Sequence, residues 1–358
     1  MDDARLVIQN LNKAYAAPVL TDVNLAVQKG EIHALVGENG AGKTTLVNIL
    51  AGLTETNSGV IRLNGRAYAP EKPTDAFAAG VSFAAQELSI IDTLNVAENV
   101  QLRRLPRRRG VVDRRKLDHQ ARDMLALVGL DNVAPARQAA ALSLAQRQLL
   151  EIAKALAGNP TLLLLDEPTA ALNAGQAARV HGILRERAND GASIIYISHR
   201  LNDVLDIADT VSVLRDGQVV ATRPPSAYSV DKLVSLMAGE ALEHTTRAAG
   251  QKGDVRIRAE GVTTARLPWP INLSAHDGEI TGLAGLAGAG RSELLHALFG
   301  LDARTGGTVT KRCADSDVAI IHAADAVKSG IALVGEDRQS MGLFEGQSVR
   351  VNMMLPGT

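Results

Sequence analysis

The sequence has very little cysteine, few aromatic residues and no excess of either charge. It contains a single cysteine, Cys313, among 358 residues, so no disulfide can form within the chain and a reducing compartment is its natural location. Aromatic residues make up only 3% and the formal net charge is −1, so composition provides no general attraction to nucleic acid. The remaining composition, 46% hydrophobic and 22% charged, is that of a globular chain long enough for two domains.

Long apolar runs are also lacking. No stretch approaches the roughly 18 apolar residues of a membrane span. The start, MDDARLVIQN, has no basic region followed by an apolar core. We therefore expect neither a signal peptide nor a transmembrane segment.

One local basic run, RRLPRRRGVVDRR at residues 103–115, is an exception to the balanced charge. It has two interpretations, a solvated surface segment or an arm that binds nucleic acid. Because no aromatic residues are interleaved with the arginines, we favour the solvated surface and expect no nucleic-acid partner.

The strongest organisational signal is an internal repeat. KGEIHALVGENGAGKTTLVNILAGL (29–53) aligns without a gap with DGEITGLAGLAGAGRSELLHALFGL (277–301). Each copy has the pattern of an apolar strand, a glycine loop and a helix closed by glycine. The similarity continues: GVSFAAQE (80–87) recurs as GIALVGED (330–337), and Val96 with Asn99 recurs as Val349 with Asn352.

The repeat predicts two domains of common ancestry. We place the first at residues 1–242 and a polar linker at 243–254. Residues 255–358 then begin a second copy that stops before the positions matching the later part of the first. The second copy is therefore expected to be incomplete.

The loop GENGAGKTTL in the first copy matches the phosphate-binding pattern GxxxxGK[ST]. Its glycines let backbone N–H groups surround phosphates, and the helix beginning near Lys43 adds its positive end. Lys43 would reach the β- and γ-phosphates, and the Thr44 hydroxyl would hold Mg²⁺. A glycine-rich turn between strand and helix is the alternative interpretation.

Two acids follow the apolar run LLLL at residues 162–165. A buried parallel strand ending in two carboxylates suits Asp166 as a magnesium partner and Glu167 as the base that polarises water. The alternative is two acids that merely end a strand.

Three further positions are weak signals individually. Tyr15 could stack on adenine or pack in the core. Gln86, at the end of an apolar strand, could meet magnesium and the attacking water, or be a surface glutamine. His199 follows the strand SIIYIS, where ligands meet parallel sheets, although a histidine there can equally be structural.

LSLAQ at residues 142–146 begins another predicted helix. Ser143 would be the N-cap and Gln146 its partner in a capping box, with Gly158 closing the helix. The pattern leaves open whether this N-terminus also faces a nucleotide.

Together these segments resemble the ATP-binding cassette ATPases, and among them the importers of simple sugars of the ribose, galactose and xylose type. The matching segments are GEIHALVGENGAGKTTL, AAQELSIIDTLNVAEN, LSLAQRQLLEIAKAL, LLLLDEPTAAL and YISHRL, in the family's order, with GLAGAGRSEL and GEDRQSMGL in the second copy. The resemblance implies an α/β fold. A P-loop nucleotide-binding domain carries a helical subdomain at about residues 93–142 and an antiparallel β subdomain, and an incomplete second copy follows.

The resemblance also implies roles for individual residues. Tyr15 would stack on adenine, Gln86 would belong to the Q-loop, and His199 would be the switch histidine. Asp166 belongs to Walker B and Glu167 is the catalytic glutamate, while Ser143 and Gln146 belong to the signature that contacts a second nucleotide. The Walker A loop comprises residues 37–45, including Gly37, Asn39, Gly40, Gly42, Lys43, Thr44 and Thr45. Lys43, Gln86, Glu167 and His199 form the catalytic set, and Thr44, Gln86 and Asp166 the magnesium set.

The sequence departs from the family at several points. Ala145 stands where the signature normally has glycine, Asn173 where many members have aspartate, and Arg291 where the second loop would have lysine. Arginine keeps the charge but is longer and planar, so it does not replace a compact ammonium in a tight phosphate cradle. We therefore expect the first loop to bind ATP and the second to be kept for structure.

The function implied is the ATP-hydrolysing, energy-coupling subunit of a sugar importer, with ATP and Mg²⁺ as ligands. The partners implied are transmembrane permease subunits, an extracytoplasmic sugar-binding protein reached through them, and a second ATPase chain or a second copy of this one. The implied location is the cytoplasmic face of the membrane. The alternatives are a soluble tandem-cassette ATPase acting on ribosomes or DNA, and a non-functional remnant of the importer subunit.

Overall fold

The computed structural model describes residues 4–85, 88–108, 110–239, 253–285, 288–313, 316–335 and 342–355. The chain divides into two compact units, Met1–Glu243 and His244–Thr358. Each unit has its own hydrophobic core. Nearly all of the proposed linker at 243–254 lies outside the described residues, so its role stays a prediction.

The centre of the first unit is a six-stranded sheet in the order β12-β11-β3-β10-β9-β6. Its inner strands pair in parallel and β12 pairs antiparallel at one edge. The strands are β3 (Ile32–Val36), β6 (Val81–Ala84), β9 (Leu162–Asp166), β10 (Ser193–Ile197), β11 (Thr210–Arg215) and β12 (Gln218–Arg223). The turn between β11 and β12 lies at Asp216 and Gly217, both with positive φ, as an Asp-Gly pair predicts.

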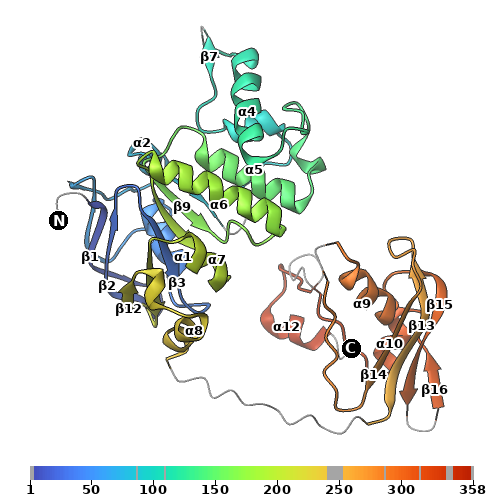
Figure 1. Cartoon of the computed structure of the whole chain (residues 1–358). Coiled ribbons are helices and arrows are strands. Elements are labelled where there is room, and N and C mark those ends of the chain that lie inside the picture. Colours follow the sequence, from blue (N-terminus) through green and yellow to red (C-terminus); the bar gives the residue numbers. More distant parts are fainter. Residues whose placement is uncertain are drawn as a thin grey trace. The chain divides into compact units, whose positions relative to one another are not determined.

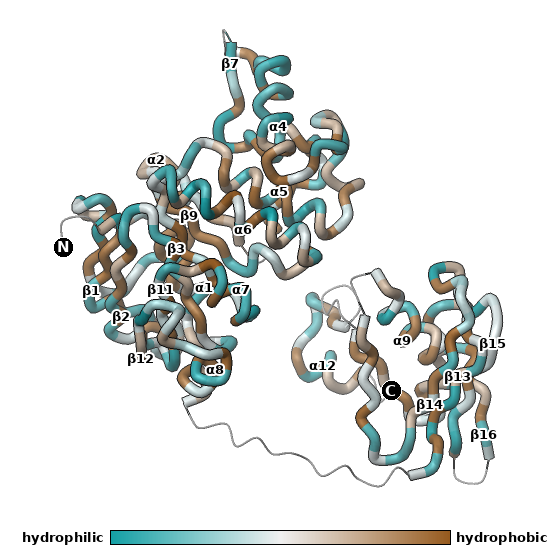
Figure 2. The backbone as a smooth tube through the Cα atoms, in the orientation of Figure 1, coloured by the Kyte–Doolittle hydropathy of each residue, from teal (hydrophilic) through white to brown (hydrophobic). Residues whose placement is uncertain are grey.

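Both faces of this sheet are covered, which explains why every residue of β3, β9 and β10 is buried. Along β9, Leu163 and Leu165 join one core while Leu162 and Leu164 join the other. Figure 2 shows the resulting apolar run along β3 and β9.

One of these cores is closed by helices, with α5 and α6 beside β9 (Figure 1). These helices are α5 (Leu144–Leu156), α6 (Ala174–Asn189), α7 (Leu201–Ile207) and α8 (Val230–Ala238), with a 3₁₀ turn η2 (Pro225–Ala227) before α8. The other core contains α1 (Lys43–Leu50) and α2 (Pro73–Ala78).

An antiparallel sheet in the order β2-β1-β4-β5 completes the second core. Its strands are β1 (Ala4–Ala14), β2 (Pro18–Gln28), β4 (Ser58–Leu63) and β5 (Arg66–Ala67). The parallel sheet and this antiparallel sheet thus sandwich α1, the helix that follows the phosphate loop.

A helical region connects β6 to β9. It contains α3 (Val96–Val100), α4 (Arg114–Val128), the 3₁₀ turn η1 (Ala139–Ala141) and the start of α5. A short hairpin of β7 (Arg107–Arg108) and β8 (Val111–Val112) carries much of the basic run and projects beside α4 (Figure 1).

Asn99 joins the beginning of this helical region to the loop before it. The side chain is fully buried, accepts a bond from the Ile91 N–H at 2.8 Å, and donates to the Ile91 and Asn95 carbonyls at 3.0 Å each. In the second unit, Asn352 makes the equivalent bonds with Phe344 and Ser348 from a less buried position.

Asn99→Ala should therefore lower the free energy of unfolding of the first unit by about 2–3 kcal/mol, because the Ile91 backbone would lose its partners inside the core. Urea unfolding followed by hydrogen exchange would report each unit separately. Asn352→Ala is the matched control and should cost less than about 1 kcal/mol, since water can replace its bonds. Equal costs at the two positions would contradict this explanation.

The second unit repeats the β subdomain of the first. Its sheet has the order β14-β13-β15-β16, which corresponds to β2-β1-β4-β5. Both sheets contain the same kind of side-chain bond between their first two strands. In the first unit Asn24 accepts from the Asn10 N–H at 3.0 Å, and in the second Asn272 accepts from the Gly261 N–H at 2.8 Å. The strands are β13 (Val255–Thr264), β14 (Ile271–His276), β15 (Arg304–Cys313) and β16 (Ser316–Ala319), and the helices are α9 (Arg291–Phe299), α10 (Ala323–Lys328) and α12 (Val349–Met354).

The prediction of a strand before the second glycine loop is wrong. Residues 279–285 form no strand, and neither do residues 331–335, which align with β6. Ile280 and Val334 are 83% and 91% exposed, whereas their counterparts Ile32 and Ala84 are buried. In the first unit, β3 and β6 are held by β9, β10 and β11. The described part of the second unit contains no equivalent of these strands. Residues 279–285 and 331–335 therefore have no neighbouring strand with which to form backbone hydrogen bonds.

Candidate active site

The phosphate loop of the first unit connects β3 to α1, as predicted. Gly37 lies so close to β11 that a Cβ would overlap the Leu214 carbonyl oxygen. Gly42 is the N-cap of α1 at φ 105°, and a Cβ there would lie 2.6 Å from Leu20 Cδ2. Only glycine allows this turn to lie against both sheets at once. The tight turn places the N-terminus of α1 directly after a loop in which Asn39 and Gly40 are exposed.

Lys43, the first residue of α1, folds back over the loop. Its Nζ donates to the carbonyl oxygens of Gly37 at 2.6 Å and Glu38 at 2.8 Å. Burial lowers the pKa of Lys43, while the nearby carboxylates of Asp166 and Glu167 raise it. The ammonium therefore lies among exchangeable carbonyl partners at the centre of the loop, where phosphate oxygens could replace them.

Thr44 and Asp166 come together from different strand ends. The Thr44 hydroxyl donates to Asp166 Oδ2 at 3.2 Å. Asp166 is 4% exposed, and its burial raises the pKa of the carboxyl although the Thr44 bond lowers it. Thr45 lies next on α1 and is half-buried. Among the described residues no group of three His, Cys, Asp or Glu side chains could hold a metal ion by itself. A hydroxyl and one carboxylate nevertheless fit Mg²⁺, which usually completes its shell with water and substrate phosphates.

Glu167 and His199 are joined directly. The Glu167 Oε1 accepts from the His199 backbone N–H at 2.9 Å, and the His199 Nδ1 lies 2.9 Å from the same oxygen. Glu167 adopts φ 53°, a left-handed conformation that costs a residue other than glycine about 1–3 kcal/mol. Its N–H donates to the Ile197 carbonyl at 2.9 Å, which helps to hold this geometry. The carboxylate therefore has a defined orientation beside Asp166.

These groups all lie at the carboxyl ends of neighbouring parallel strands. Lys43 and Thr44 follow β3, Asp166 and Glu167 end β9, and His199 follows β10. An edge of this kind is the usual ligand position in an open α/β sheet.

Comparisons with known proteins agree with this arrangement. A family model described as "ABC transporter" matches residues 20–170. "Ribose import ATP-binding protein RbsA" of Chromobacterium violaceum is 37% identical over 353 residues, which are 98% of this chain and 70% of that protein. The chain belongs to the ABC transporter ATP-binding family.

Other similar proteins carry related names. The protein of the same name from Chelativorans sp. is 40% identical over 93% of this chain and 65% of its own length. "Putative ribose/galactose/methyl galactoside import ATP-binding protein 3" of Agrobacterium fabrum is 38% identical over 94% of this chain and 67% of its own length. The chain thus spans about two thirds of the length of these relatives.

A solved ATP-binding cassette dimer, in a post-hydrolysis state bound to ADP and Pi, is similar in fold. It is 25% identical with a TM-score of 0.56, over 62% of this chain and 98% of that chain. In this ABC protein, no helix of the described residues is both long and apolar enough to cross a bilayer.

Tyr15 follows β1 in the turn to β2, and the structure excludes the core-packing interpretation. The side chain is 60% exposed, and the Lys13 Nζ lies 4.9 Å from the ring centroid. The strand after this turn reaches the phosphate loop, since Leu20 lies against Gly42. The exposed ring is available for stacking, and its role in adenine binding stays a prediction.

The signature residues are not joined to the phosphate loop by any bond among the described residues. Ser143 is the N-cap of α5 and forms the predicted capping box with Gln146, with N–H to side-chain oxygen distances of 3.3 and 3.0 Å. Asn173 caps α6 in the same way with Gln176. Ala145 is half-buried and packs against the helical core. Contact of Ser143 and Gln146 with a nucleotide stays a prediction.

Gln86 lies outside the described residues, and its role stays a prediction. Glu336, which aligns with Gln86 in the second copy, also lies outside them. Two polar residues that follow β10, Ser198 and Arg200, were not among the predicted site residues. Ser198 lies 3.5 Å from Glu167 Oε2, and its hydroxyl accepts from the Arg200 N–H at 3.1 Å, while Arg200 Nη1 donates to the Thr169 carbonyl at 3.3 Å. Their position after β10 in YISHRL was the available signal.

The glycine loop of the second unit is followed by Arg291, where that of the first unit is followed by Lys43. Arg291 begins α9, and its Cγ and Cδ lie within 3.7 Å of the position that a Cβ on Gly285 would take. Gly285 corresponds to Gly37, so the arginine stem lies beside the first glycine of the second loop. Residues 255–358 do not reach the positions that would align with Asp166, Glu167 and His199.

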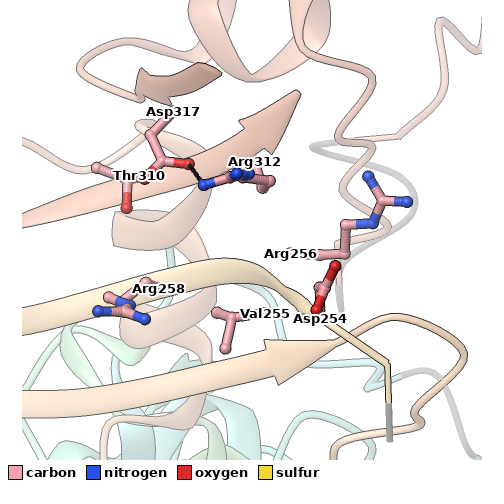
Figure 3. Close-up of a pocket in the computed structure, with 7 residues that line it drawn as sticks. All are labelled: Asp254, Val255, Arg256, Arg258, Thr310, Arg312 and Asp317. Carbon is pink, nitrogen blue, oxygen red and sulfur yellow. Dashed lines mark hydrogen bonds and ion pairs between the residues drawn. The ribbon is translucent and has the colours of Figure 1, made fainter. Parts of the chain in front are cut away.

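The second unit also has a cavity of about 290 Å³ on its sheet (Figure 3). Its lining arginines are already engaged: Arg312 pairs with Asp317 at 3.4 Å and Arg256 with Asp277 at 2.7 Å. It shares no residue with the two glycine loops, and we assign it no role in ATP binding.

Proposed function

We propose that this chain is the ATP-hydrolysing, energy-coupling subunit of a membrane importer for simple sugars. The observation that carries the proposal is the joined series of groups at one sheet edge, from Lys43 through Thr44 and Asp166 to Glu167 and His199. The ribose and galactose import proteins among the relatives support the sugar class.

Each residue has a distinct task in this proposal. The N–H groups of the loop at residues 37–45 and the Lys43 ammonium bind the phosphates of ATP. Thr44 and Asp166 would hold Mg²⁺, which would supply positive charge that neutralises the phosphates of ATP. Gln86 would join this magnesium set.

Glu167 polarises the water that attacks the γ-phosphate, and His199 keeps the carboxylate oriented. Because His199 remains 72% exposed, its ring is accessible from outside the unit. Tyr15 supplies a stacking surface for adenine. Ser143 and Gln146, at an exposed helix N-terminus, would cover a nucleotide held by another cassette, in a second chain or a second copy of this one.

The partners proposed are permease subunits, contacted by the helical region, and an extracytoplasmic sugar-binding protein that acts through them. The proposed location is the cytoplasmic face of the membrane. The residue boundaries 1–242, 243–254 and 255–358 remain our proposal for the domains.

The proposal is tested by assembling the chain with its permease subunits in liposomes and measuring ATP hydrolysis. Sugar-loaded binding protein should increase the rate several-fold, because substrate arrival outside must close the cassettes inside. Ribosomes or DNA should have no effect. Stimulation by ribosomes or DNA, with no response to the binding protein, would instead support the soluble tandem-cassette alternative, and no hydrolysis in any condition would support the non-functional remnant.

A further inference from the structure

The basic run at residues 103–115 divides into two parts with different surroundings. Its first two arginines are held on aromatic rings. The Arg103 guanidinium carbon lies 4.9 Å from the ring centroid of Phe83 and 5.6 Å from that of Phe77. The Arg104 guanidinium carbon lies 5.1 Å from the centroid of Phe77. The fold therefore uses these two arginines, and a further function would have to come from those that follow.

Four of the later arginines are exposed, two on β7 and two at the start of α4: Arg107, Arg108, Arg114 and Arg115. Among the residues that the structure describes, none of the four forms an ion pair. The single acid of the run, Asp113, is engaged, because its carboxylate accepts from the Lys116 N–H at 3.1 Å and caps α4. The four cations thus have no anionic side chain as a partner in the described chain.

The two arginines at the start of α4 occupy an electrostatically unfavourable position. The N-terminus of a helix carries partial positive charge, so cations in the first turn are destabilising. The first turn of α4 contains Arg114, Arg115 and Lys116 and no acid, with Asp113 at the N-cap as the nearest negative charge in the sequence. An anionic surface outside the chain would relieve this repulsion.

The hairpin adds an apolar side chain to this cationic surface. Arg107 pairs with Val112 across the two strands. Arg108 pairs with Val111, so these two side chains share the opposite face of the hairpin. Val112 lines a cavity within the helical region, whereas Val111 is 72% exposed. The hairpin, which projects beside α4 (Figure 1), therefore presents a valine and an arginine together to the outside.

An exposed valine among arginines suits a bilayer interface better than a nucleic acid. The apolar side chain can enter the boundary between headgroups and acyl chains while the arginines attract anionic headgroups. Surfaces that bind single-stranded nucleic acid stack bases on aromatic side chains, and residues 103–115 include none. The hairpin also belongs to the helical region, which the proposed function places against the permease subunits, so a membrane would lie near it.

We refer to five residues as the basic hairpin surface: Arg107, Arg108, Val111, Arg114 and Arg115. We propose that the basic hairpin surface binds the anionic phospholipid headgroups of the membrane. This goes beyond the proposed function, because the ATP-binding chain would contact lipid directly as well as through a permease. It rests on that proposal only for the nearness of a membrane.

The experiment measures co-sedimentation of the full chain with lipid vesicles. Phosphatidylcholine vesicles with about 30% phosphatidylglycerol should bind the chain at least ~10-fold more tightly than phosphatidylcholine alone. About 0.5 M NaCl should remove most of this difference, because salt screens exposed charges. Since each arginine near an anionic bilayer contributes roughly 5-fold, Arg107→Ser/Arg108→Ser should weaken binding at least ~10-fold.

Two further variants separate charge from apolar contact. Arg107→Lys/Arg108→Lys keeps both charges and should bind anionic vesicles within about 3-fold of the unaltered chain. Val111→Ser keeps every charge but removes the exposed apolar group, and should weaken binding roughly 3-fold. The matched control is Arg62→Ser/Arg66→Ser, which removes two exposed arginines from β4 and β5, another hairpin of the same unit. It should change binding less than about 2-fold.

Equal binding to neutral and anionic vesicles would overturn the inference, and so would an equal loss in Arg62→Ser/Arg66→Ser, which would show a general effect of net charge. Tighter binding to a DNA or RNA oligonucleotide than to anionic vesicles, lost in Arg107→Ser/Arg108→Ser, would overturn it in favour of a nucleic-acid arm. Calorimetry with MgATP on the same samples tests the proposed function separately. A chain that fails to bind MgATP would refute that function, while vesicle binding still decides the inference.

Discussion

Lys43→Ala should reduce MgATP affinity at least 30-fold. The ammonium lies within 3 Å of two loop carbonyls and close to the Asp166 and Glu167 carboxylates, so it is the positive group around which the loop is built. Removing one partner of a desolvated charge pair costs about 2–5 kcal/mol, which corresponds to roughly 30-fold or more in affinity. Titration calorimetry with MgATP measures the loss directly.

Arg291→Ala is the matched control, because it removes the equivalent cation from the second loop. It should change the affinity of the tight site less than about 2-fold. Lys43→Arg tests whether the shape of the cation matters as well as its charge. A longer, planar cation should bind MgATP more weakly than lysine in the loop that begins at Gly37. A larger effect of Arg291→Ala than of Lys43→Ala would show that the active loop has been assigned to the wrong unit.

Glu167→Gln should retain MgATP but lower turnover in the assembled transporter by about 100-fold or more. The amide oxygen of glutamine can still accept the bond from the His199 N–H at 2.9 Å, so the geometry at the end of β9 is kept. What is lost is the negative charge that polarises water. The effect should therefore appear in kcat, with the dissociation constant for MgATP changed only a few-fold.

Asp166→Asn provides the comparison, because Asp166 is bonded to Thr44 and belongs to the magnesium set. This variant should weaken the dependence of ATP binding on Mg²⁺ as well as turnover. If Glu167→Gln impaired binding and turnover equally, the carboxylate would be a structural group at a strand end, and the base would have to be sought elsewhere.

The local patterns of the sequence determined most of the first unit. The glycine loop, the apolar strand before Asp166 and Glu167 and the capping box at Ser143 all appear as predicted. These features depend on neighbours in the chain, such as backbone conformations open only to glycine or a side chain that caps its own helix, so local sequence specifies them.

Contacts between distant segments could not be read in the same way. The bond between Thr44 and Asp166 joins residues 122 positions apart, and the one between Glu167 and His199 spans 32. The patterns placed each residue at a strand end, but only the strand order brings β3, β10 and β9 side by side. The bond from Lys154 to the Ser89 carbonyl had no sequence signal, because the two residues are 65 positions apart and meet only in the folded chain.

The second unit shows most clearly that an apolar sequence pattern does not by itself determine a strand. Residues 279–285 and 331–335 carry the same apolar periodicity as β3 and β6, yet form no strands. Sequence alone determined that the two copies share a glycine loop and a following helix, and the structure shows that they also share a β subdomain. Tertiary structure decided whether the apolar segments become strands, because a strand exists only where a neighbour completes its hydrogen bonds, and the described second unit offers these segments none.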